Sequence, residues 1–175
     1  MDLKEEIKGH IRDVKDFPKK GIIFKDITPL LKNPLLCSNI VKELSSFLRP
    51  QTTHIVGIES RGFLFGLPVT IKNNLSFVLI RKKGKLPFKT ISTDYDLEYG
   101  KATIEMNIED VVPGDRVVIH DDLLATGGTA VAAARLVIEQ GALLDGFSFI
   151  VELDFLKGRE RLNEFSKNVN SIIKY

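Results

Sequence analysis

Residues 117–130, VVIHDDLLATGGTA, hold a glycine-rich turn between a strand-like run and an Ala-rich helical run. Gly127 and Gly128 fall where the helix should begin, and they let a ligand approach the main chain closely. The free N–H groups of a first helical turn, together with the helix dipole, attract phosphate. Thr126 and Thr129 add hydroxyl donors. The turn therefore predicts a monophosphate site, and it matches neither a Walker A loop nor the Gly-x-Gly-x-x-Gly dinucleotide fingerprint.

Two adjacent carboxylates, Asp121 and Asp122, stand a few residues before this turn, at the expected end of the strand. They would repel a phosphate unless they serve another part of the ligand. Carboxylates accept hydrogen bonds from vicinal hydroxyls, or hold Mg²⁺ directly or through water. A sugar phosphate with two free hydroxyls matches both halves of the segment. The plainer alternative to a ligand site is a solvated acidic turn followed by helix-capping residues. His120, just before the acids, is interpreted as a hydrogen-bonded histidine within the strand.

Other stretches carry side chains suited to a polyanionic or aromatic ligand. Arg61 follows a strand and opens a helix in ESRGFLFG, where its planar donors suit phosphate oxygens. The basic segment RKKGKLPFKT at 81–90 is suited to a lid over a polyanion, or it is simply a solvated loop. Phe24 stands in the irregular segment GIIFKD, where its ring serves either the core or a ligand. Glu98, in LEYG, is by itself most simply a surface acid of a strand, and it would need partial desolvation to hold a proton near neutral pH.

Composition is typical of a globular protein. The 175 residues suffice for one domain with a sizeable core, and 43% are hydrophobic and 27% charged. A net charge of +2 gives no argument for nucleic-acid binding, and no apolar run approaches the ~20 residues that span a bilayer. The mixed-charge start MDLKEEIKGH is unlike a secretion signal. Cys37 is the single cysteine, so no disulfide forms within the chain, which fits a reducing cytoplasm. We therefore expect a cytoplasmic protein without nucleic-acid or membrane partners.

Periodicity and breakers predict apolar strands that alternate with helices. This pattern implies an α/β fold with an open, mostly parallel twisted sheet and helices on both faces, in which ligands bind at the carboxyl ends of the strands. Residues 94–107 alternate instead like a pair of antiparallel strands. Helices are expected at 2–13, 34–48, 61–73, 127–140 and 156–165, strands at 54–58, 75–81, 116–121, 144–152 and 170–174, and loops at 16–32 and 82–93.

The segment VVIHDDLLATGGTA resembles the phosphoribosyl pyrophosphate (PRPP) motif of the type I phosphoribosyltransferases, with His120 in place of the usual apolar residue. Further stretches resemble the adenine phosphoribosyltransferase family in order and spacing, and the similarity runs from about residue 16 to about residue 162. One departure is Lys25, where an arginine is common. These stretches are FPKKGIIFKDITPLLKNP (17–34), GIESRGFLFG (57–66), LIRKKGKLPFKT (79–90), LEYGKATIEM (97–106) and VELDFLKGRERL (151–162).

The resemblance implies a type I phosphoribosyltransferase fold, with a single domain over residues 1–175. A small antiparallel hood would join the parallel sheet. Residues 1–33 would form an N-terminal segment with the purine-contacting loop, and residues 82–107 a flexible loop and antiparallel flap over the active site. Residues at the start of this flap would reach the pyrophosphate across a dimer interface, so the resemblance implies a homodimer.

The resemblance also assigns roles to individual residues. Glu98 and Arg61 are the expected catalytic residues, and Glu98 is the candidate proton carrier. Phe24 would stack on the purine while the main chain at Ile23 and Lys25 reads its edge. The expected adenine contacts are Ile23, Phe24, Lys25 and Tyr99. The ribose and 5′-phosphate of PRPP would be bound by Asp121, Asp122, Ala125, Thr126, Gly127, Gly128 and Thr129. The pyrophosphate would be bound by Ser60, Arg61, Arg81, Lys82 and Lys85.

The implied reaction joins adenine to PRPP, giving AMP and pyrophosphate with inversion at the sugar C1. Mg²⁺ would come with the substrate and need no direct protein ligand, with contact through water to Asp121 and Asp122 as a further option. Two rival functions stay open. One is a related transferase for hypoxanthine, guanine, xanthine or orotate, which a substrate panel separates. The other is a regulator that keeps the PRPP fold without catalysis, which AMP formation from adenine separates.

Overall fold

The computed structural model describes residues 2–96 and 101–175, and its centre is a seven-stranded sheet in the order β5-β6-β4-β3-β7-β8-β9. The strands from β4 to β9 in this order run parallel, whereas β6 is antiparallel to β4 and β5 is antiparallel to β6. The predicted parallel sheet with a small antiparallel flap is confirmed. The strands are β3 (His54–Ile58), β4 (Ser76–Lys82), β5 (Thr90–Asp96), β6 (Lys101–Asn107), β7 (Arg116–Leu124), β8 (Leu143–Glu152) and β9 (Val169–Lys174).

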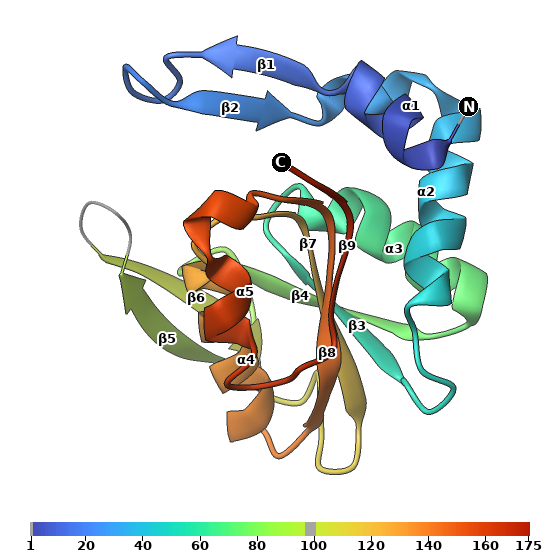
Figure 1. Cartoon of the computed structure of the whole chain (residues 1–175). Coiled ribbons are helices and arrows are strands. Elements are labelled where there is room, and N and C mark those ends of the chain that lie inside the picture. Colours follow the sequence, from blue (N-terminus) through green and yellow to red (C-terminus); the bar gives the residue numbers. More distant parts are fainter. Residues whose placement is uncertain (1, 97–100) are drawn as a thin grey trace.

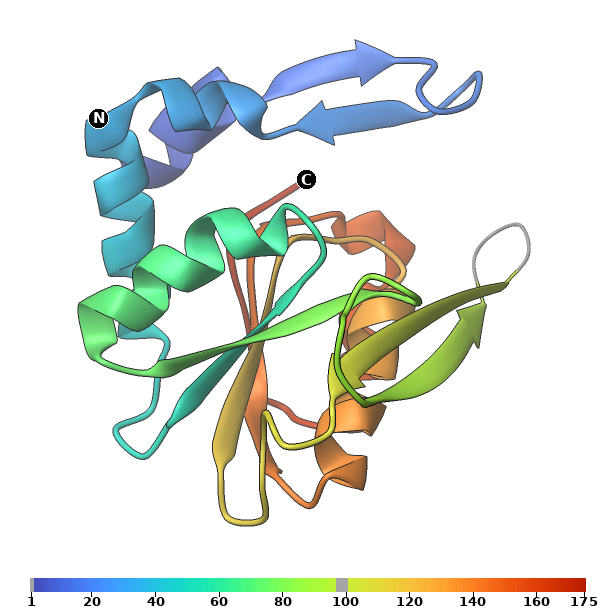
Figure 2. The ribbon, with the colours of Figure 1, turned by 180° about the vertical axis from the view of Figure 1, so that it is seen from behind.

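Helices cover both faces of the sheet (Figures 1 and 2). One face carries α1 (Leu3–His10), α2 (Pro34–Ser46) and α3 (Gly62–Asn73), and the other carries α4 (Gly128–Glu139) and α5 (Gly158–Leu162). Within β7, Val117 and Ile119 point into the α4 core while Val118 points into the other core, as strand alternation requires. Both faces are therefore packed, which explains the uninterrupted apolar run at residues 117–119 of β7. None of the helices in the described residues is long and apolar enough to cross a membrane.

The N-terminal region differs from the predicted helix at 2–13 and loop at 16–32. Helix α1 ends at His10, and β1 (Arg12–Lys15) pairs antiparallel with β2 (Ile23–Asp26) in a separate two-stranded sheet, followed by the 3₁₀ helix η1 (Thr28–Lys32). Figure 1 shows this hairpin above the end of the main sheet at which β9 and the chain finish. It therefore faces the carboxyl ends of the parallel strands.

Charge pairs join the two strands of the hairpin, which begins where the predicted helix was expected to continue. Arg12 lies opposite Asp26, and its Nη2 donates to the Asp26 carboxylate at 2.5 Å. Asp13 lies opposite Lys25, with 2.7 Å between Oδ1 and Nζ. These partners are too far apart in sequence for a helical or local pattern to reveal them. Gly21 adopts φ +90° in the connecting turn, which favours glycine.

Three predicted boundaries are also wrong. Strand β7 continues to Leu124, so the acid pair lies inside the strand, because β8 pairs with β7 as far as Glu152. Strand β5 begins at Thr90, inside the predicted loop at 82–93, because β6 pairs with it from that residue onward. The predicted helix at 156–165 shrinks to α5, which Lys157 at φ +54° separates from the short 3₁₀ helix η2 (Asp154–Leu156).

Candidate active site

Residues 24, 61 and 122, predicted from separate stretches, meet at the carboxyl end of β7. The Nε atom of Arg61, at the start of α3, lies 2.9 Å from Oδ2 of Asp122. The Arg61 guanidinium carbon lies 4.9 Å from the ring centroid of Phe24, in the overlying β2. The hairpin, the start of α3 and the end of β7 thus join in one site.

Gly62 makes the approach of α3 to β7 possible. A Cβ atom at this position would lie 2.8 Å from the carbonyl oxygen of His120 and 3.1 Å from Oδ1 of Asp121. Both distances are shorter than ordinary van der Waals contacts, and the first is to the backbone, which cannot rotate away. Gly62 is a positioning residue that sequence reasoning missed, although the glycine after Arg61 in ESRGF was visible.

Burial of the acid pair, Asp121 and Asp122, disfavours the ionised form of both carboxyl groups. Asp122 is 2% exposed, and its backbone N–H donates to Oδ1 of Asp121 at 2.9 Å. Burial, and then the charge of Asp122, raise the pKa of Asp121 well above its usual range. Burial also raises the pKa of Asp122, while the charge of Arg61 opposes that rise. The Arg61 contact is an ion pair without the alignment of a hydrogen bond, because Oδ2 of Asp122 has no hydrogen-bond partner among the described residues. A cation or hydroxyl donors at this point would lower the cost.

His120 is buried beside the acid pair, on β7. Burial lowers the pKa of His120 to about 4, and a hydrogen bond with the Ser148 backbone opposes this only in part. The ring is therefore neutral near pH 7. Its Nε2 atom is buried without a hydrogen-bond partner in the part of the chain that the structure describes, so the predicted hydrogen-bonded histidine is satisfied on one side alone.

The glycine loop, residues 125–129, connects β7 to α4. Gly127 adopts φ +80° at the start of the helix, a conformation that glycine adopts without strain. The loop borders a small cavity of about 90 Å³ that Asp121, Phe149 and residues 123–130 line. The structure therefore brings the first acid and the predicted phosphate-binding loop into the same cavity.

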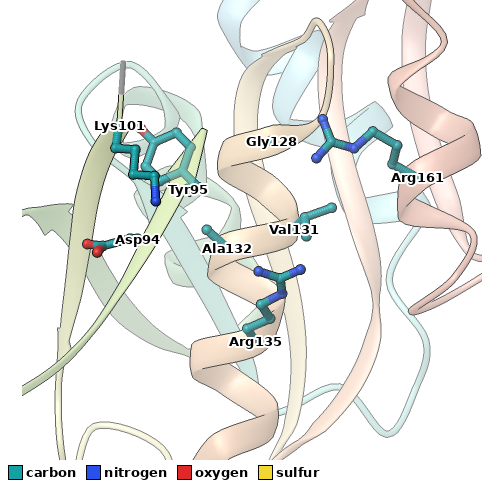
Figure 3. Close-up of a pocket in the computed structure, with 8 residues that line it drawn as sticks. All are labelled: Asp94, Tyr95, Lys101, Gly128, Val131, Ala132, Arg135 and Arg161. Atoms are coloured by element: carbon teal, nitrogen blue, oxygen red, sulfur yellow. The ribbon is translucent and has the colours of Figure 1, made fainter. Parts of the chain in front are cut away.

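A second, polar cavity of about 160 Å³ flanks the start of α4 (Figure 3). Figure 3 shows the guanidinium group of Arg161, from α5, turned toward Gly128, and Arg135 lying along the same side of α4. The opposite wall comes from the antiparallel flap. The lining residues are Asp94, Tyr95, Lys101, Gly128, Val131, Ala132, Arg135 and Arg161.

The other predicted phosphate ligands gather around Glu59. Its Oε2 atom accepts hydrogen bonds from Nε of Arg81 at 3.2 Å and from the backbone N–H of Lys82 at 2.9 Å. Nη1 of Arg81 also donates to the carbonyl of Lys85 at 3.1 Å. Glu59 directly precedes Ser60 and is joined to it by a cis peptide bond. The basic cluster is thus linked to the Ser60–Arg61 segment through this one carboxylate.

Glu105, on β6, fixes the turn that carries Lys85, and sequence reasoning missed it. It is 4% exposed, and its Oε1 accepts from the backbone N–H groups of Lys85 and Leu86, both at 2.9 Å. Burial alone raises the pKa of Glu105, but the backbone hydrogen bonds outweigh it and the pKa lies below its usual value. Glu105 is therefore ionised, and it anchors the basic segment to the flap.

An apolar pocket of about 390 Å³ lies beneath β2. Ile23 and Lys25 line it, whereas Phe24 lies on the opposite face of the strand, with its ring edge-on to Phe17 at 5.2 Å between centroids. Nζ of Lys25 lies 3.9 Å from the ring centroid of Tyr175. The far wall, which sequence reasoning missed, comes from the chain after β8 and from the C-terminus: Leu153, Phe155, Leu156 and Tyr175.

Two predicted site residues, Glu98 and Tyr99, lie outside the described residues. Among residues 2–96 and 101–175, no group of three His, Cys, Asp or Glu side chains is arranged to hold a metal ion.

Comparison with known proteins identifies the family. The model of the phosphoribosyl transferase domain matches residues 28–173. An adenine phosphoribosyltransferase from Cytophaga hutchinsonii is 49% identical over 174 residues, covering 99% of this chain and 96% of the relative. The crystal structure of adenine phosphoribosyltransferase from Thermoanaerobacter pseudethanolicus superposes with a TM-score of 0.93 at 46% identity, covering 98% of this chain and 99% of that one. An APRTase from Giardia lamblia complexed with 9-deazaadenine gives a TM-score of 0.94 at 36% identity, covering 100% and 98%.

The fold, the acid pair that leads into the glycine loop, and these full-length similarities agree with one another. On this ground the chain belongs to the adenine phosphoribosyltransferase family of type I phosphoribosyltransferases.

Proposed function

We propose that this protein transfers the 5-phosphoribosyl group from PRPP to adenine, giving AMP and pyrophosphate in purine salvage. The observation that carries the proposal is the cavity that Asp121 shares with the glycine loop. A ligand with a 5′-phosphate and two ribose hydroxyls matches these groups. The test is a pyrophosphate-release assay with PRPP, Mg²⁺ and each nucleobase in turn. Release with adenine supports the proposal, and release only with another base contradicts it.

The glycine loop would hold the 5′-phosphate and the acid pair the ribose. The first backbone N–H groups of α4 have no partner within the helix, so they suit phosphate oxygens. Asp121 and Asp122 would accept the ribose 2′- and 3′-hydroxyls, which offers hydrogen-bond donors to two carboxylates that are costly to bury. The proposed contacts are Asp121, Asp122, Ala125, Thr126, Gly127, Gly128 and Thr129.

The pyrophosphate of PRPP would lie against the loop before α3. Arg61, which now pairs with Asp122, has a planar guanidinium that can bind phosphate oxygens with several donors. Its charge would stabilise the departing pyrophosphate. The proposed contacts are Ser60, Arg61, Arg81, Lys82 and Lys85, the last three reaching the site from the partner subunit of a homodimer.

The acid pair fits a role for substrate-bound Mg²⁺. A cation or its water ligands would stabilise these two adjacent carboxylates. Both have raised pKa values, and one oxygen of Asp122 lacks a hydrogen-bond partner among the described residues. When bound, Mg²⁺ would neutralise charge on the leaving pyrophosphate. Asp121 and Asp122 would orient it through water, and no further protein ligand is required.

Adenine would bind at β2. This strand has a single sheet partner, β1, so its other edge is free to present backbone donors and acceptors to the purine. The main chain at Ile23 and Lys25 would read the purine edge, with Phe24 stacked on the base. The base would lie on the Phe24 face of β2, where the Arg61 guanidinium carbon lies 4.9 Å from the Phe24 ring centroid. Tyr99 completes the proposed adenine contacts.

The transition state would resemble an oxocarbenium ion that is attacked in line, with inversion at C1. The chain's own tasks are to align the two substrates, exclude water and manage the purine's proton. Glu98 is the proposed proton carrier, and Arg61 the residue that stabilises the leaving group.

A homodimer in the cytoplasm completes the proposal. The exposed apolar side chains of η1, α2 and α3 supply a surface for the partner subunit, namely Leu31, Leu35, Leu64, Leu67 and Ile71. The single cysteine, Cys37, is consistent with a reducing compartment.

A further inference from the structure

The start of α5 packs backbone against backbone on the glycine loop. A Cβ atom at Gly158 would lie 2.1 Å from the carbonyl oxygen of Ala125 and 3.0 Å from the backbone nitrogen of Gly127. A Cβ atom at Gly127 would in turn lie 2.9 Å from the carbonyl oxygen of Gly158. Because these neighbours are main-chain atoms, no rotamer change can make room. Any larger side chain at 158 must push the loop and α5 apart.

Arg159 fixes Gly158 against the last two strands. Its Nε donates to Oε1 of Glu152 at 2.8 Å, and its Nη1 donates to the carbonyl oxygen of Val169 at 2.5 Å. Its Nη2 contacts the second oxygen of Glu152 and donates to Oγ of Ser171 at 3.2 Å. Glu152 is 1% exposed, so this ion pair joins the buried end of β8 rigidly to α5.

Arg161 holds the loop from the outer side. Its Nη1 donates to the carbonyl oxygen of Thr126 at 3.2 Å, and Figure 3 shows the same guanidinium turned toward Gly128. The carbonyl of Gly127 accepts from Val131 within α4 at 2.9 Å. These bonds to the loop therefore use its carbonyl groups and not its N–H groups.

We infer that Gly158 and Arg161 are positioning residues for the glycine loop, with Arg159 as the anchor that ties them to the sheet. This inference rests on the proposed function, because it assigns to these residues the task of aiming the loop N–H groups at the 5′-phosphate of PRPP. Donors that bind an anion must be held in place before it arrives, and a loop with few bonds of its own needs support from outside.

The test compares Gly158→Ala and Arg161→Ala with the wild type, using ribose 5-phosphate and ribose as calorimetric probes and the KM values for PRPP and adenine as kinetic ones. Both variants should weaken ribose 5-phosphate binding and raise the KM for PRPP on the order of 10- to 100-fold, since small misplacements of binding groups cost that much. The KM for adenine should stay within about twofold, because Phe24, on which the base would stack, has its ring contacts with Phe17 and Arg61 and not with either residue. Arg161→Lys, which keeps a cationic donor, should restore part of the loss.

Gly9→Ala is the matched control, because a Cβ atom there meets nothing within 4 Å and binding should be unchanged. If Gly158→Ala does not fold, the exposed Arg161 decides the question, since its replacement leaves the core intact. Folded variants that bind ribose 5-phosphate like the wild type would overturn the inference, and so would equal losses for PRPP and adenine. Wild-type protein that binds ribose 5-phosphate but makes no AMP would instead refute the proposed function alone.

Discussion

At the scale of single residues, the site holds groups that folding alone would not favour. Two carboxylates lie side by side at the end of β7, and burial raises the pKa of both. The Arg61 ion pair compensates Asp122 only in part, because its geometry is not that of a hydrogen bond. Such cost is expected where a ligand supplies the missing partners, since binding sites often trade stability for function.

We predict that Asp121→Asn stabilises the fold while it weakens PRPP binding. Asparagine keeps the oxygen that accepts from the Asp122 N–H and removes a buried charge, so stability should rise by about 1 kcal/mol, or about 2–4 °C in Tm. A raised pKa means that the folded state binds more protons than the unfolded state, so the wild type loses stability as pH rises above ~4. The advantage of the variant should therefore grow from pH 4 to pH 7. Calorimetry measures both effects, exposed Asp2→Asn is the control, and a lower Tm would contradict the prediction.

The ring of Phe24 should matter more than the side chain of its neighbour Lys25. We expect Phe24→Ala to raise the KM for adenine, with a cost of about 1–3 kcal/mol by analogy with base–aromatic stacking. Lys25→Arg should be nearly silent, because the main chain reads the base and an arginine keeps the charge that faces Asp13. Steady-state kinetics with both substrates varied separates these outcomes. An unchanged KM in Phe24→Ala would mean that adenine stacks elsewhere.

At the scale of elements, the β1–β2 hairpin and α5 add the contacts around the carboxyl ends of the parallel strands. The hairpin brings a free strand edge over the parallel strands, and α5 supports the glycine loop from the side. The hairpin lies outside the repeating strand–helix pattern, and α5 is a shortened helix of that pattern, between β8 and β9. Each touches a part of the site that the pattern creates.

If the backbone groups at the free edge of β2 bind the base, the protein should have a higher kcat/KM for adenine than for hypoxanthine. Adenine presents an amino donor at position 6 and an acceptor at N1, whereas hypoxanthine presents the reverse. A fixed backbone carbonyl can only accept, so hypoxanthine would set two acceptors against each other in a dry site. Discrimination of roughly 10⁴-fold or more in kcat/KM is expected. Comparable values for the two bases would exclude reading by the main chain.

The anchor of α5 should control stability in acid. Burial alone raises the pKa of Glu152, but hydrogen bonds from Arg159 and Ser171 and the charge of Lys174 outweigh it and lower the pKa to about 2. A lowered pKa gives stability that is present above the unfolded value near 4.5 and is lost as pH falls toward 2. Glu152→Gln should cost roughly 3 kcal/mol at pH 7, because it leaves Arg159 without its counter-charge, and should flatten the acid limb of the stability curve.

Denaturant titrations from pH 2 to pH 7 measure this effect. Glu160→Gln is the control, because Glu160 lies in the same helix with its side chain 71% exposed, and it should follow the wild type throughout. An equal acid limb in Glu152→Gln and the wild type would show that other carboxylates govern acid unfolding.

At the scale of the whole molecule, the face that carries α2 and α3 has exposed apolar side chains. Ile71 of α3 is 73% exposed and Leu35 of α2 is 71% exposed. A cavity of about 320 Å³ lies between these helices, lined in part by Leu31, Cys37 and Leu64. Exposed apolar side chains that gather on neighbouring helices are typical of protein–protein interfaces.

We predict that Ile71→Glu dissociates the proposed homodimer. A buried charge without a partner at an interface core costs several kcal/mol, so sedimentation velocity at micromolar concentration should show a monomer. Activity should fall with it, because the proposed pyrophosphate contacts from the partner are lost. Ile138→Glu is the control, because Ile138 is a 48% exposed isoleucine on α4, away from this face. A wild type that sediments as a monomer would refute the dimer, and a dimeric Ile71→Glu would place the interface elsewhere.

The sequence by itself determined the parallel sheet and the centre of the site. Apolar strands that alternate with helices leave few arrangements open, and the carboxyl end of β7 is then the place where ligands bind. The acids and the glycine loop are neighbours in sequence, so the cavity that Asp121 shares with the loop follows from local geometry once the strand and helix are known. For this reason Asp121, Asp122 and residues 125–129 could be predicted as one unit.

Only the tertiary structure decided which distant residues support that unit. The hairpin depends on Arg12 and Asp26, which are fourteen residues apart, and the pocket beneath β2 takes its far wall from the C-terminus. Gly62 and Gly158 matter because another segment's backbone lies where their Cβ atoms would be. Hydrophobic periodicity predicts which face of a helix or strand is buried, and local propensity predicts where the element ends. Neither reports which backbone packs against it, because that is set by how the whole chain fills its core.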